Sequence, residues 1–318
     1  MNDTENNLLK NLELYYLFKL YSNMNSIENI ITLLKKNIKN TNKNKSSYWK
    51  FHLENSNYNE IYNQLNFGNY TKKNFLSFMH YIMQRLIFDK EIFKSDIYTI
   101  VKSEFNNIKR VPDFDTIKHV ALFCKLKNIC NPKSICIIGD GKLNGILTAN
   151  AAFPEAKLFN VNLSETLIND LLILQKLNSS LKNNIKFISS YDDNTSDQKL
   201  NIVPSNFKET LAKRNIDLFI NIASFQEMPF EEIEKYFKII KTCKSLLYSC
   251  NREVKHLEKR YGYGGEKLEF NKYPWGNYNS LFWEICPWYK KTYSFRPPFI
   301  IKNMHTIIHC LVDYSHLK

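Results

Sequence analysis

The chain has 318 residues, of which 44% are hydrophobic and 14% aromatic, enough for one large domain or two smaller ones with a hydrophobic core. Charged residues make up 24%, so the composition excludes an intrinsically disordered chain. The net charge of +13 would suit a nucleic-acid-binding protein, but the lysines are scattered and form no Arg-rich stripe, so we interpret most of them as a solvated surface.

Cysteine usage and the start of the chain bear on its compartment. The seven cysteines are odd in number and include no Cys-x-x-Cys pair, which favours a reducing compartment over a disulfide framework. Asp3 and Glu5 stand where a signal peptide would be basic, and no apolar run approaches the roughly 20 residues that a membrane span needs. We expect a soluble cytoplasmic protein that binds neither membrane nor nucleic acid; the sequence is compatible with a homo-oligomer.

The first part of the chain, residues 1–112, is expected to form an all-helical region. Apolar residues recur there at helical spacing, for example at Leu8 and Leu12 and again at Phe75 and Phe78. Asn-rich segments separate the helical stretches. Such a region would cover an acceptor site or form a dimer surface, and the sequence does not choose between the two.

From residue 113 to 318 short β-rich runs alternate with helical segments. A helix capped by Asp115 should end before Asn131 and Pro132. Strands are predicted at 134–138, 157–161, 217–221 and 245–249, with 185–189 and 201–203 competing for another, and helices at 143–152, 164–177, 206–213 and 229–241. This alternation predicts an α/β fold with a doubly wound parallel sheet.

The C-terminal stretch 299–314 is β-rich and contains no helical segment, which fits a closing antiparallel strand or hairpin. His305 and His309 would share one face of such a strand, an arrangement that can bind a metal. No third ligand is identifiable, so we predict no metal site.

A glycine-rich turn follows the first predicted strand. Gly139, Asp140 and Gly141 would let the backbone turn tightly and approach a ligand, and the helix behind them offers free N–H groups. A nicotinamide site would place an acid at the end of the second strand, where Asn162 stands, and the spacing up to Gly145 differs from the dinucleotide pattern. Asn162 can still bind a ribose diol, so these points alone leave the cofactor class open.

Three segments together resemble a family of sugar O-methyltransferases with the class I S-adenosylmethionine-dependent fold. They are the Gly139-Asp140-Gly141 turn, Asn162-Leu-Ser-Glu165-Thr-Leu and, most specific, Asn221-Ile-Ala-Ser224-Phe-Gln-Glu227-Met. The resemblance implies a Rossmann-like methyltransferase domain over 113–318 and S-adenosylmethionine as cofactor. It also implies methyl transfer to a hydroxyl of a sugar or glycoconjugate precursor, that is, a small-molecule saccharide or nucleotide-sugar substrate.

The chain departs from the family pattern at two positions. An acid is common where Ile137 stands, two places before the first glycine of the turn, and another is expected in place of Asn162. Both changes would weaken polar contacts to the cofactor. An antiparallel closing strand, by contrast, is the feature that separates the methyltransferase sheet from the dinucleotide-binding one.

Ligands of an open α/β sheet bind beyond the carboxyl ends of its strands, so the residues directly after each strand are the site candidates. The cofactor-binding candidates are Gly139, Asp140, Gly141, Asn162, Ser205 and Asn221. Gly139 to Gly141 would face the amino-acid part of the cofactor and Asn162 its ribose. Ser205, with Pro204 and Asn206, is favoured near the adenine, and Asp192 is the alternative.

A sugar hydroxyl needs a base within hydrogen-bond reach as it loses its proton. Glu227, after the fourth strand, is the candidate; its alternative role is that of a first-turn acid for the helix that follows, and both interpretations stay open. His256 is a fallback base. Asn251 and Arg252 would bind substrate hydroxyls or a phosphate, and Trp275, in a long Gly-hinged loop with residues 261–265, would stack on a sugar ring.

Three other functions compete with this prediction. A nucleic-acid methyltransferase is disfavoured because Asn221-Ile-Ala-Ser stands where Asn-Pro-Pro-Tyr would be expected. A nicotinamide-dependent sugar oxidoreductase is disfavoured by Asn162 and by the terminal β-rich stretch. A degenerate, non-catalytic binding protein on the same fold stays open, because fold does not fix function.

Overall fold

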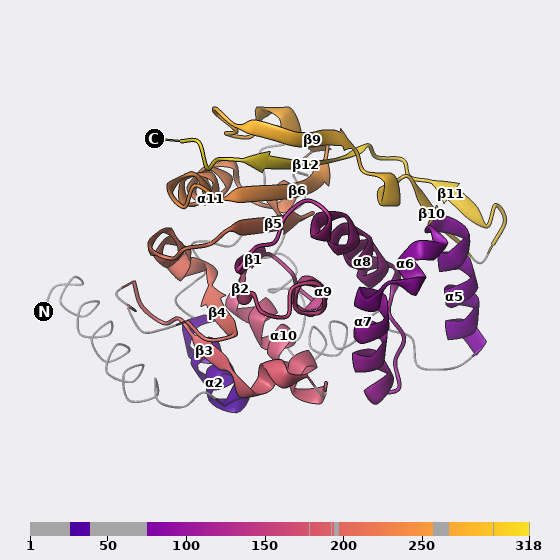
Figure 1. Cartoon of the computed structure of the whole chain (residues 1–318), viewed down its shortest axis with the longest axis horizontal. Helices are drawn as coiled ribbons and strands as arrows, with labels where there is room; N and C mark the ends of the chain where they lie inside the picture. Colours follow the sequence, from indigo (N-terminus) through magenta and orange to yellow (C-terminus); the bar gives the residue numbers. More distant parts are fainter. Residues whose placement is uncertain are drawn as a thin grey trace, which may run out of the picture.

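The central element of the protein is one mixed β-sheet that runs across the molecule from β3 to β9 (Figure 1). The computed structural model describes residues 26–38, 75–177, 179–191, 193, 197–256, 267–294 and 296–317. The strands of the sheet are β1 (Ser134–Ile138), β2 (Lys157–Asn162), β3 (Ile185–Phe187), β4 (Leu200–Pro204), β5 (Leu218–Ile222), β6 (Leu246–Arg252), β9 (Asn279–Ile285) and β12 (Ile307–Asp313). Their order is β3-β4-β2-β1-β5-β6-β12-β9.

Strand directions confirm the predicted fold class. The six strands from β3 to β6 run parallel, and β12 is inserted antiparallel between β6 and β9. The chain moves from β1 to β2 on one side of the sheet and later to β5 on the other, so strand order reverses at β1. The fold is therefore an α/β Rossmann-like sheet of the methyltransferase type, closed by a C-terminal antiparallel strand, and its ligand crevice is expected at the carboxyl ends of β1 and β5.

The helices α8 (Phe114–Lys127), α9 (Asn144–Ala152), α10 (Ser164–Lys176) and α11 (Phe230–Thr242) lie close to their predicted positions. The N-cap of α8 is Asp113, whose carboxylate accepts the N–H of Thr116 at 2.7 Å, and not Asp115 as the sequence suggested. Asp115 instead lies in the first turn, 3.0 Å from the ammonium of Lys118. The predicted helix at 206–213 is the 3₁₀ helix η3 (Ser205–Lys213).

Two predictions about strands are corrected. The two competing segments both form strands: β4 pairs with β2, and β3 pairs with the other side of β4. The C-terminal stretch is divided into β11 (Ile300–Lys302), which pairs with β10 (Lys291–Tyr293), and β12. His305 lies in the bend between them, so it shares no strand face with His309. Within the described ranges no group of three or more His, Cys, Asp or Glu could hold a metal ion.

Both faces of the sheet are covered, which explains the unbroken apolar run of β1. All five residues of β1 are buried. Ile135 and Ile137 pack with the helices α8 to α10, whereas Cys136 and Ile138 pack with α11 on the other face. Successive side chains of a strand alternate between faces, so a strand between two helical layers needs apolar residues at every position.

The part of the predicted helical region 1–112 that the structure describes is helical. It contains α2 (Ile27–Ile38), α5 (Phe75–Ile87), α6 (Lys90–Lys94) and α7 (Asp96–Asn107). α2 packs on α10, and α7 packs on α8 and α9, so both join the layer that covers the sheet. That residues 1–112 form a separate unit stays a prediction. None of the helices in the described part of the chain has the length and apolar character that crossing a membrane requires.

Candidate functional site

The turn after β1 requires glycine at its first position. Gly139 has φ +78°, and a Cβ added there would lie 2.4 Å from the Cβ of Ser224 in the loop after β5. The Ser224 hydroxyl donates to the carbonyl oxygen of Ile138 at 2.9 Å. The two loops that flank the switch point of the sheet are therefore held in direct contact, and any side chain at position 139 would separate them.

Asp140 supports the turn through the helix that follows it. One carboxylate oxygen accepts the N–H of Gly145 at 2.9 Å and the other accepts the N–H of Ile146 at 2.9 Å. These N–H groups belong to the first turn of α9 and have no partner within the helix, and a carboxylate there also complements the helix dipole. Burial raises the pKa of Asp140, opposed by the nearby His119 and by these hydrogen bonds. The predicted cofactor residue Asp140 thus uses both its oxygens on its own helix.

A second buried carboxylate fixes the turn from behind. Asp170 of α10 accepts the N–H of Leu143 at 3.0 Å and the side-chain amide of Asn160 at 2.8 Å. The neighbouring Asn169 donates to the carbonyl oxygen of Gly141 at 3.0 Å. Burial raises the pKa of Asp170 well above its usual range. The backbone path from 139 to 143 is therefore set by α10 as well as by its own glycines.

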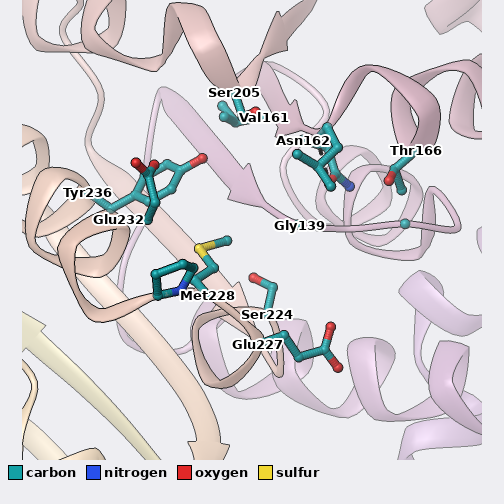
Figure 2. Close-up of a pocket in the computed structure, with 13 residues that line it drawn as sticks. Gly139, Val161, Asn162, Thr166, Ser205, Ser224, Glu227, Met228, Glu232 and Tyr236 are labelled. Carbon is teal, nitrogen blue, oxygen red and sulfur yellow. Dashed lines mark hydrogen bonds between the residues drawn. The ribbon is translucent and has the colours of Figure 1, made fainter. Parts of the chain in front are cut away.

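A small cavity of about 90 Å³ opens at this turn (Figure 2). Its lining residues are Gly139, Gly141, Val161, Asn162, Leu163, Thr166, Ser205, Ser224, Glu227, Met228, Pro229, Glu232 and Tyr236. In the view of Figure 2, Ser205 and Val161 lie at one edge and Ser224 and Glu227 at the opposite edge. The structure thus brings together four predicted cofactor residues, Gly139, Gly141, Asn162 and Ser205, on one cavity.

Asn162 presents an unused donor at this cavity. Its side-chain oxygen accepts the N–H of Leu163 at 2.9 Å. Its Nδ2 atom is buried and has no hydrogen-bond partner among the described residues. A buried amide donor without a partner is costly, so a ligand oxygen at this position would be bound favourably.

The other adenine-side candidates do not line this cavity. Pro204 is the last residue of β4. The side-chain oxygen of Asn206 accepts a hydrogen bond from the side-chain amide of Asn37 in α2 at 3.1 Å. Asp192, the alternative, lies outside the described residues.

A larger cavity of about 730 Å³ adjoins the small one and shares Gly139, Gly141, Ser224 and Glu227 with it. Its lining is rich in charged side chains, in contrast to the smaller cavity. The charged and histidine residues that line it are Asp115, Lys118, His119, Asp140, Lys142, Glu227, Arg252, Lys291 and His305. These residues come from α8, the turns after β1, β5 and β6, and the C-terminal segments.

Glu227 lies where the two cavities meet, because it lines both. Burial raises the pKa of its carboxyl, and the positive charges of Lys255 and Arg252 oppose that rise. The alternative role of a first-turn acid is filled by Glu231 and Glu232 of α11, whereas Glu227 belongs to the separate 3₁₀ helix η4 (Phe225–Glu227). The geometry therefore favours a role in the cavity over a role in the helix.

A network of side-chain amides positions the loop that carries Glu227. The oxygen of Asn221 accepts the N–H of Phe225 at 3.2 Å and the amide of Asn251 at 2.9 Å. The oxygen of Asn251 accepts the N–H of Gln226 at 3.2 Å, and the Gln226 oxygen accepts the N–H of Arg252 at 2.8 Å. The end of β5 is thus joined to the end of β6 on either side of Glu227.

This network changes the roles predicted for two asparagines. Asn221, predicted to bind the cofactor, is fully buried and lines neither cavity. Asn251, predicted to bind substrate, borders the larger cavity but is also fully buried, with its oxygen and its amide engaged inside the network. Both side chains hold the loops in place. Arg252, by contrast, lines the larger cavity and contributes only its backbone N–H to the network.

Trp275 does not belong to the site. It is 5% exposed and packs in an aromatic cluster on the α11 face of the sheet, where its ring centroid lies 4.8 Å from that of Trp283. Its indole N–H donates to the carbonyl oxygen of Phe270 at 2.8 Å. The prediction that it stacks on a sugar is therefore corrected: the ring is core. His256 is exposed at the end of β7 (Val254–His256) and lines neither cavity, and residues 261–265 lie outside the described ranges.

His119 is a site residue that the sequence analysis missed. It is 8% exposed, belongs to α8 and lines the larger cavity. Its Nδ1 lies 2.9 Å from the carbonyl oxygen of Asp115. A carbonyl oxygen only accepts, so Nδ1 carries the proton and Nε2 is the acceptor in the neutral ring. The spacing of four residues between Asp115 and His119 was the available signal, since it places both on one helix face.

Comparison with known proteins gives similarity at the level of structure only. No protein-family model matches the chain, and no curated protein matches it. Cofactor-bound Rv0187 from MTB is similar with a TM-score of 0.37 and 12% identity, over 77% of this chain and 99% of that one. MtNAS in complex with MTA and tNA is similar with a TM-score of 0.39 and 10% identity, over 98% of each chain. A methyltransferase from Geobacter sulfurreducens is similar with a TM-score of 0.39 and 12% identity, over 75% of this chain and 96% of that one.

Proposed function

We propose that the chain is an S-adenosylmethionine-dependent methyltransferase that acts on a hydroxyl of a saccharide or nucleotide sugar. The observation that carries the proposal is the position of Glu227, which lines both the small cavity at the glycine turn and the larger charged cavity. A methyl donor and an acceptor bound in adjoining cavities would meet beside this carboxylate. The three sequence segments that resemble sugar O-methyltransferases supply part of both linings.

The residues of the small cavity suit one part of the cofactor. A Cβ added at Gly141 would meet only the methyl group of Thr166, at 3.6 Å, so the backbone there leaves open space, and the unpaired Nδ2 of Asn162 is a donor for a ribose oxygen. Ser205 would lie toward the adenine. S-adenosylmethionine, when bound, would supply an electrophilic methyl group for transfer to the acceptor oxygen.

The chain's own residues would align the acceptor and remove its proton. Glu227 accepts the hydroxyl proton as the oxygen attacks, and its raised pKa brings it closer to the working pH that favours general-base catalysis. His119 is a second candidate base in the same cavity, because its Nε2 is the acceptor atom of the ring. The amide network around Asn221 and Asn251 holds the loop of Glu227 rigid, which serves alignment.

Calorimetric titration of the purified chain with S-adenosylhomocysteine, with NADH and NADPH in parallel, tests the proposal. We expect micromolar binding of S-adenosylhomocysteine that is lost in Gly141→Leu. Gly276→Leu is the matched control, because Gly276 has a similar left-handed conformation, φ +64° against +72° for Gly141, but lines neither cavity.

Two outcomes would overturn the proposal. Binding of a nicotinamide in place of S-adenosylhomocysteine would make the chain an oxidoreductase. No binding of any of the three by folded protein would support the non-catalytic binding protein, in which Ile137 and Asn162 replace the acids expected for cofactor binding.

A further inference from the structure

The cations of the larger cavity fall into two groups. Those beside α8 are neutralised: the Lys118 ammonium lies 3.0 Å from Asp115, and that of Lys142 lies 3.7 Å from Asp113 and 3.9 Å from Asp115. Arg252 and Lys291 also line the cavity, and neither forms an ion pair with a carboxylate of the described residues. The end of the cavity that is lined by Arg252, Lys291 and His305 therefore carries two cations without such an ion pair.

Backbone contacts bring this end together from three segments. Arg252 is the last residue of β6 and pairs in register with Ile307 of β12. The N–H of Glu253 donates to the carbonyl oxygen of Thr306 at 2.9 Å, next to His305. The N–H of Asn303 donates to the carbonyl oxygen of Lys290 at 2.9 Å, beside Lys291. Arg252, His305 and Lys291 thus converge on the cavity although they are distant from one another in the sequence.

The pKa shifts of two neighbours agree in direction with positive charge at this end. The pKa of His305 is lowered, first by Arg252, then by burial and by Lys255. The same two cations, Lys255 and Arg252, act on the carboxyl of Glu227. Lys255 also forms no ion pair within the described part of the chain. Arg252 and Lys255 therefore both act on the carboxyl of Glu227, Arg252 from the cavity lining and Lys255 from outside it.

Given the proposed function, we propose that the acceptor carries a phosphate group, bound at this end by Arg252 and Lys291, with Lys255 as a nearby positive charge. A phosphate dianion would pair with Arg252 and Lys291, whereas the hydroxyls of a neutral sugar would leave both without a counter-ion. The guanidinium of Arg252 can hold two phosphate oxygens at once, and the lysines add point charges. Thr292 and Asn303 line the same end and add polar groups. The substrate class is a sugar phosphate or a nucleotide sugar, with a free hydroxyl directed to Glu227.

The test is a titration of the full chain with inorganic phosphate, glucose 1-phosphate and glucose at constant ionic strength, with and without saturating S-adenosylhomocysteine. We expect phosphate and glucose 1-phosphate to bind in the millimolar range or tighter and glucose not to bind in that range. Arg252→Gln should weaken both phosphate ligands about tenfold or more, because it removes the bidentate contact. Lys255→Gln and Lys291→Gln should each weaken them about threefold to fivefold.

Arg252→Gln keeps the backbone N–H that joins Arg252 to Gln226, so the fold and the loop of Glu227 should be preserved. Lys238→Gln is the matched control, since Lys238 is an exposed cation of α11 that lines neither cavity. Phosphate binding that Lys238→Gln weakens as much as Arg252→Gln does, or no phosphate binding at all, would overturn the proposal. Loss of S-adenosylhomocysteine binding alone would contradict the proposed function and leave the anion site standing.

Discussion

The two adjoining cavities are built in different ways. The small one is lined by backbone, hydroxyl and apolar side chains and the amide of Asn162, and its one acid besides Glu227 is Glu232, which pairs with Lys208 at 2.9 Å. The larger one is made of charged side chains from α8, from the strand ends and from the C-terminal segments. A nucleoside needs shape and a few hydrogen bonds, whereas an anionic acceptor needs charge. The contrast implies that substitutions on the two sides should separate cofactor affinity from acceptor turnover.

Glu227, the titratable residue among the four that both cavities share, gives the largest expected effect. Glu227→Gln keeps the shape of the side chain but removes its ability to take a proton. We expect kcat for methyl transfer to fall by about 10²- to 10⁴-fold, the usual contribution of a general base, while S-adenosylhomocysteine affinity stays within about twofold. Single-turnover kinetics and calorimetry measure the two quantities.

Glu231→Gln is the control for that experiment, because Glu231 is an exposed acid in the first turn of α11. Full activity in Glu227→Gln together with a loss in His119→Asn would transfer the role of base to α8. Equal losses of turnover and of cofactor affinity in Glu227→Gln would break the division between the two cavities.

The contact between Gly139 and Ser224 gives the next largest effect, on the cofactor side. Gly139→Ala places a Cβ 2.4 Å from the Cβ of Ser224 and forces alanine into φ +78°. We expect the free energy of unfolding to fall by about 3 kcal/mol, the sum of overpacking and backbone strain. Urea denaturation measures this loss, and the added Cβ should also weaken S-adenosylhomocysteine binding.

Gly276→Ala separates the two causes. Its φ of +64° imposes similar strain, but the atom nearest its Cβ is the far end of the Lys241 side chain, which can shift, so we expect a loss of only about 1 kcal/mol. The double variant Gly139→Ala with Ser224→Gly removes the steric contact and should recover most of the difference. No recovery would show that the loops after β1 and β5 are not held by this contact.

His309, a buried residue of β12, should make the free energy of unfolding depend on pH. Burial, with a smaller contribution from Lys125, lowers its pKa to about 4, against the opposing effect of Glu284. Its Nδ1 lies 3.2 Å from the Tyr248 hydroxyl and its Nε2 lies 3.1 Å from Glu284, which suits a neutral ring. The unfolded chain takes up a proton near pH 6.5 and the folded chain does not, so this residue contributes stability at neutral pH that is lost as the pH falls from 6.5 toward 4.

Urea denaturation of the wild type and of His309→Gln at several pH values measures that contribution. We expect the wild type to lose about 2 to 3 kcal/mol more than the variant between pH 7.5 and pH 4.5. Parallel losses in both proteins would show that His309 is protonated in the fold.

The small cavity could be predicted from the sequence better than the larger one. The small cavity follows one strand and its turn, so glycine spacing and strand ends were enough to select Gly139, Gly141, Asn162 and Ser205. The parallel sheet and its closing strand β12 also follow from local patterns of apolar residues. These features depend on neighbours in sequence.

The larger cavity depends on residues distant in sequence, which local patterns of residues predict less well. His119 was not predicted because the site candidates were taken from the ends of strands, whereas His119 lies on α8, before β1. Trp275 was assigned to the substrate because an aromatic residue in a Gly-rich loop looks alike whether it faces a sugar or the core. Asn221 and Asn251 do follow strands, but their amides are used by neighbouring loops, and that pairing shows only in three dimensions.

The smallest expected effect is on cofactor affinity, from changing Asn162, the amide that stands where an acid is expected. Asn162→Asp keeps the oxygen that accepts the N–H of Leu163 and gives the second position an acceptor in place of the unpaired Nδ2. A carboxylate binds ribose hydroxyls through charged hydrogen bonds, which are stronger than neutral ones by about 1 kcal/mol. We expect S-adenosylhomocysteine affinity to rise about fivefold in Asn162→Asp and to fall in Asn162→Leu, as measured by calorimetry. Weaker binding in Asn162→Asp would mean that the ribose oxygen accepts from Nδ2 and cannot turn to donate to a carboxylate. The departure at this position would then be a change in what the small cavity selects, and not a loss of affinity for the same ribose.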